Sequence, residues 1–254
     1  CNGLVDVVFN ATRCTGASKI ENGQTFSAFH NSKSIKNVTI GANVENLPDY
    51  LFFGCSSLNT INIPQGVKTI ANNTFAGCIN LTTINYDAAR CEETLAFNGS
   101  AVVNLTIGAN VKSIPNFAFT DCIRLNDFIL PTTVENIGKY AFKSCANLKK
   151  ITLPEQLKTI EGGAFEDCGN LREVYFNAIN CRAIVEYADG DLDAENTALL
   201  EELANPEKYE NDQLAAIDSQ LFIIPVFHST SIRKVILGPK VESIADYMFY
   251  QCHD

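Results

Sequence analysis

Residues 105–173 read LTIGANVKSIPNFAFTDCIRLND, FILPTTVENIGKYAFKSCANLKK and ITLPEQLKTIEGGAFEDCGNLRE, which are three consecutive blocks of 23 residues with one pattern. Within a block, apolar residues stand at positions 1 and 3, Gly or Pro at 4, Val or Leu at 7, Ile at 10, Phe at 15, Cys at 18 and Leu at 21. A fixed period of this length is typical of solenoids, in which each coil buries its apolar side chains against its neighbours. The stretch therefore predicts a solenoid.

The same pattern extends in both directions along the chain. Standard blocks begin at Val38, Ile61, Leu105, Phe128, Ile151 and Val235. Three variant blocks, residues 7–37, 84–104 and 174–234, keep the first positions but replace the Val, Ile, Phe and Cys that follow by Asn-Ala or Asp-Ala and a Cys at position 8. We therefore expect residues 1–254 to form a single solenoid domain.

Both ends of the sequence fall in the middle of a block, with Cys1 at position 18 and Asp254 at position 20. Terminal coils of a solenoid expose apolar side chains and an unpaired strand edge unless they are capped. We expect the chain to be a piece of a longer array, or its ends to be covered by another chain, so end-to-end self-association stays open. No apolar run approaches the length of a transmembrane helix.

Each standard block contains one short strand pattern. From position 21 to position 3, for example in residues 58–63, apolar and polar residues alternate, and the Gly or Pro at position 4 ends the strand. The rest of a coil, such as residues 72–78, is too short for a long helix and predicts a turn or a brief helical bend. The expected fold is an α/β-type repeat solenoid with a parallel β ladder and short helical or irregular return segments, in which Phe119, Phe142 and Phe165 align in a buried row.

The longest variant block contains an acidic insertion at residues 187–220. Residues 186–220 hold 11 of the 29 acidic residues against the single base Lys208, which accounts for the net charge of −10. Leu199, Leu200 and Leu203 recur at helical spacing, so we expect a helical insertion. It could cover an edge of the core or offer an acidic contact surface. The remaining 18 acids and 18 bases cancel, which argues against nucleic acid or anionic lipid as a partner.

The cysteines follow the repeat as well. Position 18 holds Cys55, Cys78, Cys122, Cys145, Cys168 and Cys252. A residue that recurs once per coil at a core position is best explained as a small buried hydrophobe, so we expect free thiols. Cys78 and Cys91 are 13 residues apart, as are Cys168 and Cys181. The intervening strand would separate such partners by on the order of 15 Å, too far for a disulfide, although pairing between neighbouring coils stays open.

Written out as LxxIxIPxxVxxIxxxAFxxCxxL, the standard block resembles the BspA-like class of leucine-rich repeat proteins. Residues 61–81, INIPQGVKTIANNTFAGCINL, match that pattern closely, and the six standard blocks cover about half of the chain. The resemblance implies a secreted or cell-surface protein that takes part in adhesion by binding host proteins, other cells or extracellular matrix. It brings no catalytic motif and no ligand identity.

The sequence offers little for catalysis or for a cofactor. His30 and His228 each follow Phe in equivalent parts of two variant blocks, and a thiol repeated in every coil is a poor candidate for a unique nucleophile. Asp189, Asp191, Asp193 and Glu195 alternate as in a calcium loop, but Ala194 and Leu200 stand where that loop requires Gly and Glu. We therefore expect neither an enzyme nor a bound metal or cofactor.

The candidate ligand-binding residues occupy positions 23 and 2, on the outer face of the expected ladder. In the later coils these are Asp127, Ile129, Lys150, Thr152, Glu173, Tyr175, Lys234 and Ile236. Their mixture of charged, aromatic and aliphatic groups is typical of a contact surface for a protein or glycan. The competing interpretation is that such residues only favour strands. In that case the chain is a structural spacer without a ligand of its own.

Overall fold

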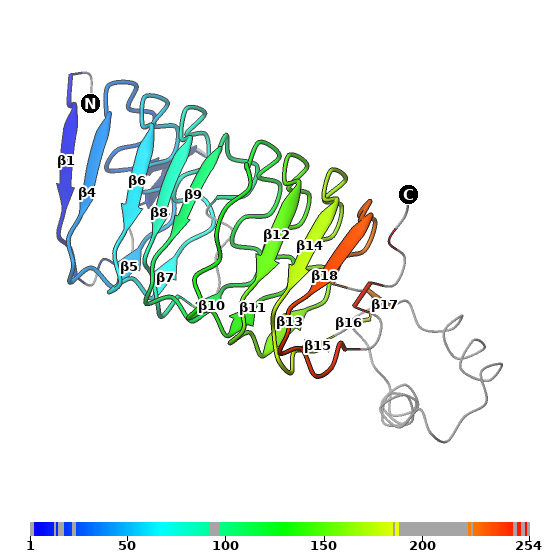
Figure 1. Cartoon of the computed structure of the whole chain (residues 1–254). Helices are drawn as coiled ribbons and strands as arrows, with labels where there is room; N and C mark the ends of the chain where they lie inside the picture. Colours follow the sequence, from blue (N-terminus) through cyan, green and yellow to red (C-terminus); the bar gives the residue numbers. More distant parts are fainter. Residues whose placement is uncertain are drawn as a thin grey trace, which may run out of the picture.

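The computed structural model shows a solenoid whose strands stack side by side in chain order (Figure 1). It describes residues 3–12, 14, 18–21, 24–91, 97–184, 186–187, 223–224, 226–245, 248–249 and 252. The principal ladder contains β1 (Asp6–Phe9), β4 (Asn37–Ile40), β6 (Thr60–Ile63), β8 (Thr83–Tyr86), β9 (Asn104–Ile107), β12 (Lys150–Leu153), β14 (Glu173–Phe176) and β18 (Lys234–Leu237). The predicted repeat fold with a parallel ladder is confirmed.

Successive strands pair at equivalent positions of the repeat. Ile84 of β8 lies opposite Ile61 on one side and Leu105 on the other, and Val174 of β14 likewise lies between Ile151 and Val235. Because neighbouring coils are near copies, this register places position 1 over position 1 within each of the three paired groups, β1-β4, β6-β8-β9 and β12-β14-β18. Positions 1 and 3 are buried in most of these strands while positions 23 and 2 face outward, as the alternation of the sequence predicts.

A second, shorter parallel ladder runs along the return side of the coils. It consists of β5 (Asn46–Leu47), β7 (Thr69–Ile70), β10 (Ser113–Ile114), β11 (Asn136–Ile137), β13 (Thr159–Glu161) and β15 (Arg182–Ile184). Sequence reasoning missed these strands because two or three residues are too few for an alternation to show. Turns complete the described coils, so the short helical return segments are not confirmed. No described helix is long and apolar enough to cross a membrane.

Two of the variant blocks carry antiparallel hairpins. β2 (Ser18–Glu21) pairs with β3 (Gln24–Ser27) in the first, and β16 (Glu186–Tyr187) pairs with β17 (Ile223–Ile224) in the third. The second hairpin brackets the acidic insertion. Residues 188–222, which contain all of the acidic insertion except Tyr187, lie outside the described residues. The predicted helices and the calcium candidates Asp189, Asp191, Asp193 and Glu195 fall in this range.

A row of stacked phenylalanine rings forms the spine of the core. The row contains Phe29, Phe52, Phe75, Phe97, Phe119, Phe142, Phe165, Phe227 and Phe249, with successive ring centroids 5.1 to 5.8 Å apart and ring planes within 16° of parallel. The predicted alignment of Phe119, Phe142 and Phe165 is confirmed. The expectation that variant blocks lose this residue is wrong, because Phe29, Phe97 and Phe227 continue the row. Insertions and deletions before each of them had hidden the match.

The position 18 cysteines form a second column beside the rings. Each described thiol at this position lies 3.2 to 3.5 Å from the carbonyl oxygen of the phenylalanine one coil earlier, to which it donates a weak hydrogen bond. In two of the variant blocks Ser100 and Thr230 take the place of the cysteine and lie 3.5 Å from the next thiol in the column. The described cysteines are free thiols.

These buried thiols should be chemically inert in the folded protein. Burial raises the pKa of Cys78 and of Cys122 from 9.0 to about 12, so little of the reactive thiolate forms near neutral pH. We expect Ellman's reagent at pH 8 to modify Cys122 at least about 100-fold more slowly in the native protein than in guanidinium. Mapping the modified residues by mass spectrometry measures this ratio, and equal rates would contradict a buried column.

The same pKa shift predicts alkaline destabilisation. Between about pH 9 and pH 12 the thiol of Cys122 ionises in the unfolded chain but stays protonated in the folded one. The unfolded state then binds fewer protons than the native state, so stability should fall as the pH rises through this window.

Candidate binding face

The strands β12, β14 and β18 bring six of the eight candidate residues onto one outer face. The pairing places Lys150, Glu173 and Lys234 in one row across the three strands. Thr152, Tyr175 and Ile236 form a second, parallel row two residues further along. These are the lime, yellow-green and orange strands of Figure 1. Their inward neighbours fix the arrangement, because a slip of one residue would turn every outward side chain into the core.

Charges on this face are only partly neutralised within it. The hydroxyl of Tyr175 donates a hydrogen bond of 2.8 Å to Glu173 Oε2, and this bond raises the pKa of Tyr175 above its usual value. Lys150 and Lys234 flank Glu173, but neither forms an ion pair with a described residue. Both ammonium groups are exposed and remain able to meet an anionic group of a ligand.

Side chains of neighbouring coils pair with each other at several other places on the solenoid. On the early part of the principal ladder Asn37 donates a hydrogen bond of 2.7 Å to Asp6, and Asn85 donates one of 2.6 Å to Asn62. On the return side, Lys68 lies 2.8 Å from Glu45. The exposed lysines of β12 and β18 differ from these pairs in having no ion-pair partner among the described residues.

Asp127 borders the candidate face at β12 but does not belong to a strand. The expected strand at residues 127–130 is not formed, and the principal ladder has no arrow between β9 and β12 in Figure 1. Asp127 Oδ1 accepts hydrogen bonds from the backbone amides of Lys149 at 2.8 Å and Lys150 at 3.1 Å. One coil later the carbonyl of Lys149 accepts the corresponding pair of bonds. The aspartate side chain thus replaces a main-chain acceptor, which is how short polar side chains compete with regular structure.

Ile129 likewise lies outside a regular strand. Its side chain is 82% exposed, whereas the preceding residue, Phe128, is half-buried with its ring 4.9 Å from Phe142. No backbone hydrogen bond joins the amides of residues 128–130 to another described residue. The principal ladder is therefore interrupted at this coil, between the segment β6-β8-β9 and the segment β12-β14-β18.

The described residues contain no group of three or more His, Cys, Asp or Glu side chains able to hold a metal ion. His228 Nδ1 lies 3.5 Å from Glu166 Oε1, and Lys143 Nζ lies 3.2 Å from the same oxygen. None of these three residues belongs to β12, β14 or β18. The outer face of β12, β14 and β18 presents cationic, hydroxyl and aromatic groups side by side, and such groups can form noncovalent contacts with a ligand.

Comparison with solved structures returned bacterial leucine-rich repeat proteins. A leucine-rich repeat protein from Eubacterium ventriosum is 20% identical over 65% of this chain and 53% of its own, with a TM-score of 0.43. The T. pallidum leucine-rich repeat protein TpLRR is 23% identical over 80% of this chain and 79% of its own, with a TM-score of 0.42. A leucine rich cell surface protein from Faecalibacterium prausnitzii is 22% identical over 75% and 61%, with a TM-score of 0.37.

The chain spans about half the length of the first of these proteins. None of the curated proteins compared with it matches. The family described as BspA type Leucine rich repeat region matches in six copies over residues 24–94, 93–189 and 213–254. These ranges include all of the variant block at residues 84–104 and parts of the other two, so the match extends beyond the half of the chain that the standard blocks make up. The chain therefore belongs to the BspA-type leucine-rich repeat family.

Proposed function

We propose that the chain is a non-catalytic recognition or adhesion module that binds a protein or glycan through the outer face of β12, β14 and β18. The observation that carries the proposal is the pair of exposed lysines, Lys150 and Lys234, which have no ion pair among the described residues and flank Glu173 and Tyr175. A surface with unpaired charge beside an aromatic ring supports contact with a polar partner. Membership of a family with cell-surface members supports secretion or display outside the cell.

The proposal predicts that this face carries the affinity. In a screen of the purified chain against extracellular matrix proteins and glycans, the variant Lys150→Ala/Glu173→Ala/Tyr175→Ala should weaken binding of any captured ligand at least about 100-fold. A matched control, Thr39→Ala/Asn62→Ala/Thr106→Ala, alters exposed outer positions of the early coils and should bind as the unchanged chain does. Surface plasmon resonance measures both.

An unchanged affinity in the first variant would refute this face as the binding site. If no ligand is captured at all, the alternative function, a structural spacer within a larger surface protein, gains support. The same screen should be repeated with residues 187–220 deleted, because the acidic insertion is the other candidate contact surface. Loss of binding only in the deletion variant would move the site from the sheet to the insertion.

A further inference from the structure

The variant block of residues 84–104 is shorter than its neighbours at one particular turn. Phe97 and Val102 are five residues apart, whereas the equivalent pairs Phe75 and Leu81, and Phe119 and Leu125, are six apart. All of these side chains are buried in the core, so the missing residue must be lost from the exposed turn between them. The amide of Val103 still bonds to the carbonyl of Thr82, so the coil rejoins the ladder normally.

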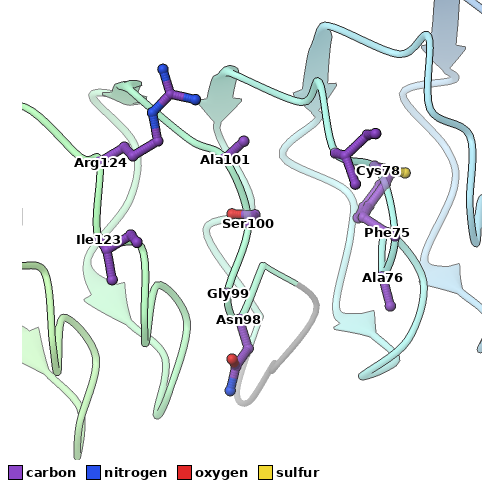
Figure 2. Close-up of a pocket in the computed structure, with 11 residues that line it drawn as sticks. Phe75, Ala76, Cys78, Asn98, Gly99, Ser100, Ala101, Ile123 and Arg124 are labelled. Carbon is purple, nitrogen blue, oxygen red and sulfur yellow. The ribbon is translucent and has the colours of Figure 1, made fainter.

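The shortened turn leaves a hollow between the coils on either side. Its volume is about 340 Å³, which is within the range of natural ligand pockets. Ile79 stands on one side and Ile123 on the other, with Ala101 between them on the short coil. Figure 2 shows Ile123 and Ala101 on adjacent coils, with Asn98 and Gly99 below Ala101. A Cβ added at Gly99 would meet no atom within 4 Å, so the space beside the turn is open.

The two isoleucines are large apolar residues on the surface of the chain. Ile79 is 68% exposed and Ile123 is 58% exposed, although both belong to well-packed coils in the middle of the solenoid. The equivalent residues in two other coils are Ala146 and Gly169. Large aliphatic side chains therefore stand on both sides of this shortened turn. The turn between Phe227 and Ile232 is equally short, but the coil before it carries Gly169 at the equivalent position. Two exposed apolar walls around a notch are a common sign of a contact site.

Arg124 supplies a charge at the rim of this hollow. The equivalent residues of other coils are Asn80, Asn147 and Asn170, whose amides donate hydrogen bonds to carbonyl oxygens of the preceding coil. Arg124 lies on the coil that follows the short one, and its side chain does not form the hydrogen bond that these asparagines donate. Its exposed guanidinium has no hydrogen bond or ion pair with any described residue. Figure 2 shows Arg124 extending on the Ala101 side of its coil.

We propose that this hollow binds a protein segment in which an aliphatic side chain is followed by a carboxylate. The aliphatic group would lie between Ile79 and Ile123 over Ala101, and the carboxylate would pair with Arg124. An arginine fork is well suited to a carboxylate, and its charge selects an acidic partner. The walls are too exposed to enclose a free small molecule, which favours a side chain presented by a larger partner. This site goes beyond the proposed function, since it shares no residue with the β12-β14-β18 face.

The test uses methyl NMR of the full chain with labelled isoleucines. The probe is an acetylated, amidated octapeptide, Gly-Ser-Gly-Leu-Asp-Gly-Ser-Gly, and comparison peptides replace Leu by Ala or Asp by Asn. We expect the methyl signals of Ile79 and Ile123 to shift saturably with the Leu-Asp probe. Each comparison peptide should bind about tenfold more weakly, since it lacks either the apolar or the charged contact.

Two substitutions restore the residues that neighbouring coils carry, so both should fold. Arg124→Asn should weaken the Leu-Asp probe about tenfold, and Ala101→Ile should abolish binding by filling the notch. Lys149→Asn, at another exposed base, is the matched control and should change nothing. The absence of saturation up to about 5 mM, or equal binding by Arg124→Asn, would overturn the proposal. The Lys150→Ala/Glu173→Ala/Tyr175→Ala variant should bind the probe unchanged, so failure here is distinguishable from failure of the sheet face.

Discussion

Replacing Phe142 by alanine should lower the free energy of unfolding by about 3–5 kcal/mol. The ring is fully buried and stacks between Phe119 at 5.5 Å and Phe165 at 5.4 Å, with Phe128 in contact from the side at 4.9 Å. The substitution removes a large buried apolar surface and leaves a cavity in the middle of the row. The rings on both sides are held by their own coils, so the cavity cannot readily collapse.

Urea unfolding followed by circular dichroism measures this change. Ile129→Ala is the matched control, because it truncates an aliphatic side chain on the same coil that is mostly exposed to solvent. We expect the control to shift the free energy of unfolding by no more than about 0.5 kcal/mol. If Phe142→Ala and Ile129→Ala had similar effects, the row of rings would not be the spine of the fold.

Gly108→Ala should destabilise the chain by about 2 kcal/mol, because the new methyl group displaces the Asp87 carboxylate and crowds its backbone. A Cβ at this position would lie 1.5 Å from Asp87 Oδ1 and 3.3 Å from Asp87 Cα, so moving the carboxylate alone does not relieve all of the crowding. Position 4 is glycine wherever the preceding coil is a variant block. In the same way, a Cβ at Gly41 would meet the side-chain oxygen of Asn10, and one at Gly238 would meet that of Asn177.

A double-mutant cycle isolates this contact. In an Asp87→Ala background, Gly108→Ala should cost less than about 1 kcal/mol, because the two closest atoms of the aspartate are gone. Gly169→Ala is the control: a Cβ there meets no atom within 4 Å, and the expected change is within about 0.5 kcal/mol. Thermal and urea unfolding of the four variants would settle the coupling, and simple additivity would contradict the steric explanation.

Position 4 of the block holds either glycine or proline, and the sequence explains only part of this choice. The sequence indicates that either residue ends the strand, and both do. Pro64, Pro131 and Pro154 follow standard coils, while glycine follows variant coils. The reason for the alternation is a contact between coils, in which the Asn or Asp side chain of one coil occupies the space of a Cβ in the next. The pattern was visible in the sequence, but its cause was not.

The candidate face was predicted in part. Six of its eight residues lie together because register follows from the repeat, and every block contributes the same two outward positions. Asp127 and Ile129 were assigned by the same rule and do not follow it. The aspartate carboxylate can bond to backbone amides of the next coil, and in doing so it displaces the main-chain pairing that the rule assumes.

The period of the sequence alone determined the solenoid, the parallel ladder and the buried row of phenylalanines. It could do so because each coil meets near copies of itself, so a residue's surroundings are set by its position in the block. Only the tertiary structure decided where that rule fails: the interrupted strand at residues 127–130, the hollow beside Ala101 and the second ladder of short strands. These features depend on contacts between unlike coils, and a pattern that describes the average coil does not contain them.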